Sequence, residues 1–97
     1  MIVNEYYLQA INDRCKSFYK KAKVFVFEDG RKVLRSYATD VAFIKCGELY
    51  VYDLYSNTTT RHIKEFATQN GFSFKNGRDL MKRYNADRYN YTSFENL

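Results

Sequence analysis

Residues 55–66 read YSNTTTRHIKEF and hold the densest set of chemically active groups in this chain. Threonine hydroxyls, the single histidine and two cations follow one another at the expected start of a helix. Free N–H groups at a helix N-terminus, together with hydroxyls and cations, suit a phosphate. The same residue types are common N-caps, so a plain strand-to-helix junction is the alternative interpretation. The candidate binding residues in this stretch are Tyr55, Ser56, Thr58, Thr59, Arg61, His62 and Lys64.

Enzymatic chemistry has little support elsewhere in the sequence. A nucleophile needs a base within hydrogen-bond reach, and His62 is the only histidine. The chain has no Gly-rich phosphate loop and no H-E-x-x-H pair. Cys15 and Cys46 lie far apart, outside any C-x-x-C pair, and at apolar positions where a free cysteine is usually buried. We therefore expect no catalytic residue, no metal and no cofactor.

The net charge of +5 is concentrated at the two ends of the chain. Basic residues near position 20 lie among Phe18 and Tyr19, and those over residues 78–88 lie beside Tyr84 and Tyr89. Basic grooves with aromatic rings suit single-stranded nucleic acid, because phosphates meet cations while bases stack on rings. Solvated helix surfaces with buried aromatics are the alternative interpretation. The candidate binding residues at the ends are Lys20, Lys21, Lys82, Arg83 and Arg88.

The first part of the chain, residues 1–22, is predicted to be helical. Apolar residues recur at spacings of three and four from Tyr7 to Tyr19. This spacing is typical of one long amphipathic helix, here over residues 4–22. Asn4 would be its N-cap, and the lysines near its end would complement the helix dipole.

Residues 23–55 change to a period of two, which predicts an antiparallel sheet of two hairpins. The first hairpin has strands near 23–28 and 31–37 around Asp29-Gly30, a pair that suits a type I′ turn. The second has strands near 41–46 and 48–54 around a tight turn at Cys46-Gly47.

In the last predicted strand, Tyr50 and Tyr52 point to the same face of the sheet. Either a helix covers this face, or the two rings form an exposed surface that suits a protein partner. Both tyrosines are therefore candidate binding residues.

A helix is predicted over residues 58–70, with Gly71 just beyond its end, and a short helix near 77–85. These elements form a helical part over residues 56–85, followed by a polar and aromatic tail over 86–97. The predicted fold is a single α+β domain over residues 1–97. It has a four-stranded antiparallel sheet, a long N-terminal helix and one or two C-terminal helices, clustered on one sheet face.

Residues 36–71, SYATDVAFIKCGELYVYDLYSNTTTRHIKEFATQNG, carry two motifs. The first is Ser36-Tyr37-x-Thr39, and the second runs Tyr-Ser-x-Thr-Thr-x-Arg-His-Ile from Tyr55 to Ile63. In these motifs the chain resembles a family of small uncharacterised phage-encoded proteins. The resemblance covers about a third of the chain, brings no established activity and implies a phage or prophage context.

The expected function is therefore that of a non-enzymatic phage-encoded binding protein. In the leading hypothesis it acts on a host protein or nucleoprotein complex as an inhibitor of host defence, similar in role to anti-CRISPR proteins. The alternative is direct binding of DNA or RNA in phage regulation or replication. No apolar run reaches membrane-spanning length. We expect the protein in the cytoplasm of the infected bacterial host, without a membrane partner, as a monomer or as a homodimer through an edge strand.

Overall fold

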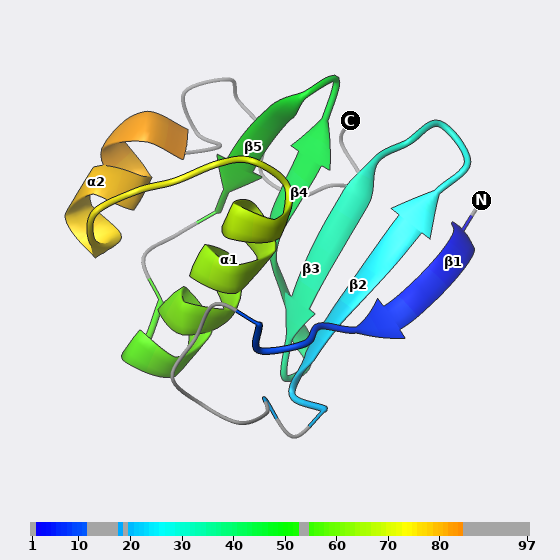
Figure 1. The fold of residues 1–97 in the computed structure, drawn as a ribbon, viewed down its shortest axis with the longest axis horizontal. Helices are drawn as coiled ribbons and strands as arrows, with labels where there is room; N and C mark the ends of the chain where they lie inside the picture. Colours follow the sequence, from blue (N-terminus) through cyan, green and yellow to red (C-terminus); the bar gives the residue numbers. More distant parts are fainter. Residues whose placement is uncertain (1, 12–17, 19, 53–54, 85–97) are drawn as a thin grey trace.

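The computed structural model describes residues 2–11, 18, 20–52 and 55–84. Within them lie five strands followed by two helices (Figure 1). The elements are β1 (Ile2–Tyr7), β2 (Ala22–Phe27), β3 (Lys32–Ser36), β4 (Thr39–Lys45), β5 (Glu48–Val51), α1 (Asn57–Gln69) and α2 (Gly77–Tyr84).

The strands form one antiparallel sheet in the order in which they occur in the sequence, β1-β2-β3-β4-β5. The four strands from β2 onwards lie within a few residues of the ranges that the alternation predicted. A bulge between Leu34 and Arg35 shifts the register of β3 against β4.

The predicted type I′ turn at Asp29-Gly30 is wrong. Gly30 has a φ of 92°, but Asp29 is not among the described residues with positive φ. Gly30 N–H donates to Phe27 C=O at 2.9 Å, so the turn begins one residue earlier and Gly30 follows it in the left-handed region. Cys46 and Gly47 both have positive φ, at 53° and 76°, as a type I′ turn requires. Cys46 is exposed in this turn, contrary to the burial expected for it.

The two faces of the sheet carry separate apolar clusters. The face toward the helices holds alternate strand residues such as Val24, Leu34 and Ala42, which pack with Ile63 and Phe66 of α1. The smaller cluster on the opposite face consists of Val33, Phe43 and Tyr50, with Phe27 and Tyr52 packed against it. The main core is therefore the layer between the sheet and the helices.

The predicted N-terminal helix over residues 4–22 is wrong. Residues 2–7 form β1, which pairs with β2, and Leu8 N–H extends the pairing by donating to Ala22 C=O at 2.9 Å. Asn4 lies inside the strand and is no N-cap. Ile2, Val3, Tyr6 and Tyr7 are β-branched or aromatic residues, which favour a strand once a neighbouring strand offers its free edge. Residues 12–17 and 19 of the predicted helix lie outside the described part.

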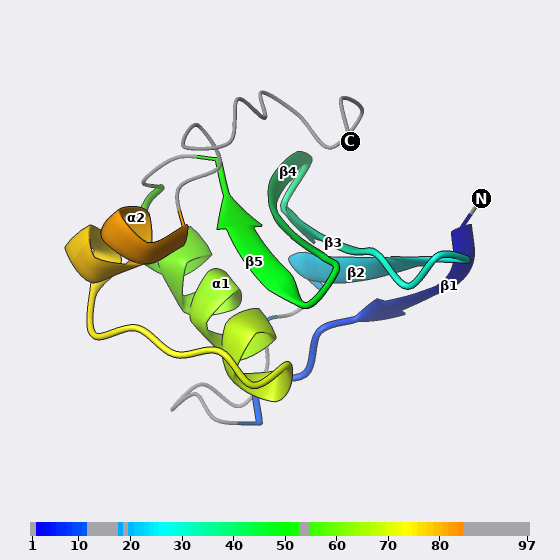
Figure 2. The ribbon, with the colours of Figure 1, turned by 90° about the horizontal axis from the view of Figure 1, so that it is seen from above.

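The two helices after the sheet agree with the predicted ranges. Both lie on the same side of the sheet, where α1 packs against β3 and α2 against β5 (Figure 2). Gly71, with a φ of 87°, follows the end of α1 as predicted. The predicted layout as a whole is nevertheless wrong, because the sheet has five strands and the described residues contain two short helices and no long N-terminal one. The predicted tail over 86–97 lies outside the described residues.

Candidate nucleic-acid interface

The TTTRH stretch forms the first turns of α1, and Ser56 is the N-cap. Its hydroxyl oxygen accepts a hydrogen bond from Thr59 N–H at 3.3 Å. The predicted strand-to-helix junction is therefore present, and this capping hydrogen bond accounts for Ser56 without a ligand. Ser56 and Thr58 are exposed at the helix start, whereas Thr59 is buried.

Thr59 and His62 turn inward and meet Ser36 of β3. Ser36 Oγ lies 2.8 Å from His62 Nδ1 and 3.1 Å from Thr59 Oγ1. The edge of the Phe18 ring packs against the imidazole at a centroid distance of 4.6 Å, and Tyr37 lies 5.9 Å from it. A serine beside a histidine is the pairing of an activated nucleophile. Here the side chains of the pair are covered, since Ser36 and His62 are each 2% exposed, and the pair ties α1 to β3.

This cluster joins the two motifs of residues 36–71. Ser36 and Tyr37 come from the first motif, and Thr59 and His62 come from the second. In three dimensions they form one contact between the end of β3 and the start of α1.

The other predicted site residues divide by exposure. Tyr50 is buried and stacks on Phe43 at a centroid distance of 4.8 Å, while Tyr52 and Tyr55 are half-buried. The idea that Tyr50 and Tyr52 form an exposed tyrosine surface is therefore wrong. Arg88 lies outside the described residues. The exposed candidates are Ser56, Thr58, Arg61, Lys64, Lys20, Lys21, Lys82 and Arg83.

The two basic ends of the chain do not form one site. Lys20 and Lys21 immediately precede β2, whereas Lys82 and Arg83 lie on α2, which packs against β5. Two further strands separate β2 from β5 in the sheet. At about 4.8 Å between neighbouring strands, that is a distance of about 14 Å.

Charges on the sheet are largely matched by opposite charges. Ion pairs join Lys23 to Glu5 at 3.0 Å and Arg35 to Asp40 at 2.8 Å. The hydrogen bond to Asp40 raises the pKa of Arg35. The cations also lie over rings, with the Arg35 guanidinium 4.6 Å and the Lys23 ammonium 5.3 Å from the Phe25 centroid. These two cations of the sheet are therefore paired with acids and packed on a ring of the sheet itself, so they add little net charge to it.

The hairpin of β2 and β3 is similar. Arg31 pairs with Asp29 at 2.8 Å and lies 4.8 Å from the Phe27 centroid. The Arg31 backbone N–H, and then its guanidinium, lower the pKa of Asp29. The hairpin end of the sheet therefore also combines opposite charges.

The excess positive charge lies on the helices. Residues 57–84 contain six Lys or Arg and two acids, Glu65 and Asp79. Glu65 is 2% exposed, and Asp79 pairs with Arg83 at 2.8 Å. All six cations are exposed, and they define what we call the helical basic surface: Arg61, Lys64, Lys75, Arg78, Lys82 and Arg83.

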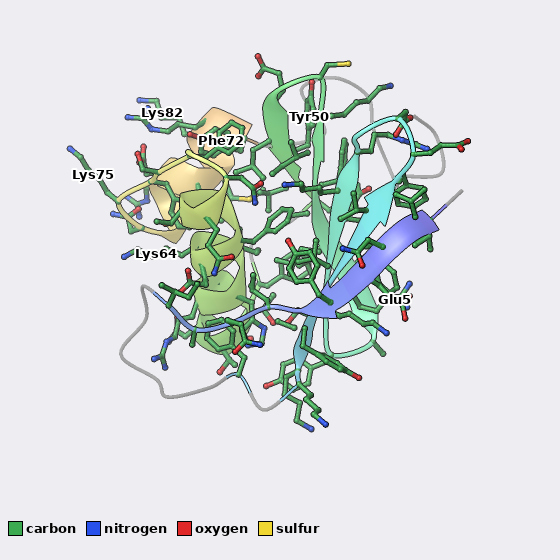
Figure 3. All side chains as sticks on the ribbon, turned by 45° about the vertical axis from the view of Figure 1, so that its right-hand side comes forward. Glu5, Tyr50, Lys64, Phe72, Lys75 and Lys82 are labelled. Carbon is green, nitrogen blue, oxygen red and sulfur yellow. The ribbon has the colours of Figure 1, made fainter. Side chains whose placement is uncertain are left out.

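Three lysines show how this surface is arranged. Lys64 of α1, Lys75 of the connecting loop and Lys82 of α2 project from the helical side, away from the sheet (Figure 3). The sequence analysis singled out Lys64 in the 55–66 stretch and Lys82 at the C-terminal basic end, but not Lys75. In the sequence, Lys75 appeared only as part of the excess of cations over acids in this region.

Among the described residues, no group of three or more His, Cys, Asp or Glu side chains could hold a metal ion. No helix in that part of the chain is long and apolar enough to cross a membrane.

Comparison with known protein families matches residues 6–82 to a family of unknown function, DUF8033. No curated protein and no solved structure matches the chain. The match includes the buried Ser36 cluster and most of the helical basic surface.

Proposed function

The chain belongs to DUF8033, a family of unknown function, and we propose that it is a non-enzymatic protein that binds nucleic acid through the helical basic surface. The observation that carries the proposal is the separation of charge. Residues 57–84 hold six exposed cations and two acids, of which one acid is buried and the other is paired with Arg83. A surface with one sign of charge attracts polyanions and guides their approach.

The fold supports this use of the helices. The buried apolar residues of α1 pack against the sheet in the main core. The exposed cations of α1 take no part in that packing, so they can point outward without disturbing it. The lysines at 64, 75 and 82 come from three successive segments and project on one side (Figure 3). A phosphate backbone running across α1 and α2 would therefore meet several cations in turn.

A finer form of the proposal follows from the resemblance of residues 36–71 to phage-encoded proteins. In this form the nucleic acid is part of a host nucleoprotein complex, and binding inhibits host defence. Its test is whether expression of the protein protects a phage from a defended host. Loss of protection in the variant described next would link protection to the basic surface.

The direct test is a titration of labelled single- and double-stranded DNA and RNA at several salt concentrations. The variant Lys64→Gln, Lys75→Gln, Lys82→Gln lowers the formal net charge from +5 to +2. Each phosphate contact to a single strand contributes about 0.7 to the slope of log K against log salt. We expect the wild type to bind and the triple variant to lose about 2 from that slope.

A matched control separates position from net charge. The variant Lys23→Gln, Arg31→Gln, Lys45→Gln also removes three positive charges, but it removes them from the sheet side of the molecule. It should bind with nearly the affinity and salt slope of the wild type. Equal losses in both variants, or no binding by the wild type at low salt, would refute the proposed surface.

A further inference from the structure

Tyr37 has a backbone conformation that is unfavourable for a tyrosine. Ser36 pairs with Thr39, so Tyr37 and Ala38 alone connect β3 to β4. The φ of Tyr37 is 57°, in the region where glycine or asparagine is usual and a bulky residue is an outlier. Its side chain is 56% exposed and therefore contributes little to the core.

A second residue with the same property lies beside it. Lys20 has a φ of 64° and an exposed side chain, whose ammonium lies 5.8 Å from the Tyr7 ring centroid. Tyr37 N–H donates to Lys21 C=O at 2.7 Å, which holds the two segments together. One end of the sheet thus presents an aromatic ring and two lysines, from two segments with unfavourable backbone. Such outliers persist where the surrounding structure fixes them, and they are concentrated at functional sites.

We propose that Tyr37, with Lys20 and Lys21, forms a stacking site for an unpaired base of a single-stranded nucleic acid. An exposed ring offers a flat face to a base, and lysines of the neighbouring segment can meet phosphates of the same strand. Bases within a duplex are already stacked on each other, so the site favours single strands.

The site borders the helical basic surface. Tyr37 lies against His62, and the preceding residue of α1, Arg61, belongs to that surface. A strand held at Tyr37 can therefore continue across α1. This inference rests on the proposed function and specifies the form of nucleic acid that it selects.

The competing explanation is that Tyr37 only covers His62. Removal of the ring would then change stability and leave binding unaltered. The two explanations differ in what the ring touches, a base or only the protein, so binding and folding must be measured on the same variants.

The experiment uses the full chain and two labelled probes of equal length and charge: an oligothymidylate, and the same strand with abasic sugars at internal positions. Tyr37→Asn and Tyr37→Gly remove the ring with residues that suit positive φ, so the turn is kept. Tyr37→Phe keeps the stacking face. Tyr6→Ala is the matched control, because Tyr6 is an exposed tyrosine on β1.

We expect the Asn and Gly variants to bind the normal strand at least about fivefold more weakly than the wild type, since that is the smallest usual effect of losing one stacked base. They should bind the abasic strand as the wild type does, with melting temperatures near that of the wild type. The Phe and Tyr6→Ala variants should bind both probes normally. An oligouridylate in place of the DNA tests whether RNA is stacked in the same way.

Two results would overturn the inference in distinguishable ways. If the ring-free variants bind both probes like the wild type, while the triple lysine variant loses affinity, the stacking site is refuted and the proposed function stands. If the wild type binds neither probe at low salt, the stacking site is refuted, and the proposed function is refuted with it only if the wild type also binds no RNA and no duplex.

Discussion

At the residue scale, Ser36 is the point where the sheet holds the first helix. Its hydroxyl lies within hydrogen-bond distance of both His62 and Thr59, and all three side chains are buried. A buried polar group that loses its partner retains the full cost of leaving water. The serine therefore matters more to stability than its size suggests.

Ser36→Ala should lower the free energy of unfolding by about 1–3 kcal/mol, because His62 Nδ1 and Thr59 Oγ1 lose their common partner in the interior. Urea denaturation measures the loss. Ser73→Ala is the same change at an exposed serine and should stay within about 0.5 kcal/mol of the wild type. Equal stability of the two variants would show that the buried bonds contribute nothing net.

At the element scale, α2 begins with a reciprocal set of polar contacts. Asp79 N–H donates to Asn76 Oδ1, and the Asp79 carboxylate accepts from Lys75 N–H, both at 2.9 Å. The carboxylate also binds Arg83 one turn later, at 2.8 Å. The Lys75 N–H, and then the Arg83 guanidinium, lower the pKa of Asp79. The acid is thus part of the cap of a helix that carries three cations of the basic surface.

Because the pKa of Asp79 is lower in the folded protein, its contribution is present above the unfolded value of about 3.9 and is lost as pH falls through the folded value. NMR titration of the Asp79 carboxyl should give a midpoint below that of an unstructured aspartate. Arg83→Gln should raise this midpoint only part of the way, since the stronger contact from Lys75 N–H remains. Arg78→Gln is the control. A midpoint at or above the usual value would contradict the capping role.

Side chains of neighbouring residues occupy the outward-facing backbone groups of the edge strand β1. Leu8 N–H points toward β2, so the backbone groups of Glu5 and Tyr7 point away from the sheet. Asn4 Oδ1 accepts from Glu5 N–H at 2.9 Å, and Gln9 Nε2 donates to Tyr7 C=O at 3.4 Å. These contacts occupy groups that would otherwise pair with another strand.

The variant Asn4→Ala, Gln9→Ala should therefore self-associate more strongly than the wild type, because it frees the edge beside exposed apolar residues such as Val3. Sedimentation velocity over a range of concentrations measures the change. Asn57→Ala removes an exposed asparagine from α1 and should leave the sedimentation profile unchanged. A double variant that sediments like the wild type would show that the side chains do not protect the edge.

The elements also show what the sequence can predict. Strands β2 to β5 have one face in a core, so their residues alternate and their ranges were predicted closely. All six residues of β1 are exposed, so neither face imposes alternation, and a helical spacing from Tyr7 onward misled the prediction. The turn at Asp29-Gly30 was misassigned because Gly30 alone supplies positive φ.

At the scale of the whole molecule, charge is divided between two layers. The sheet matches its cations with acids and rings, while the helices carry most of the excess. Counting residues along the chain revealed that excess, since it is a property of composition. The sequence could not show that Lys20 lies beside β2 while Lys82 lies on a helix that packs against β5, or that Tyr37 has a positive φ, because both depend on the folded backbone.

The sheet order β1-β2-β3-β4-β5 also bears on how the chain folds during synthesis. Each strand pairs with its neighbour in the sequence, so contacts are local and the sheet can form in the order in which the ribosome delivers it. The helices emerge afterwards, so the main core between the sheet and the helices can close only then. The basic surface that we propose for nucleic acid is thus completed last, and a nascent chain does not present it until α2 has been made.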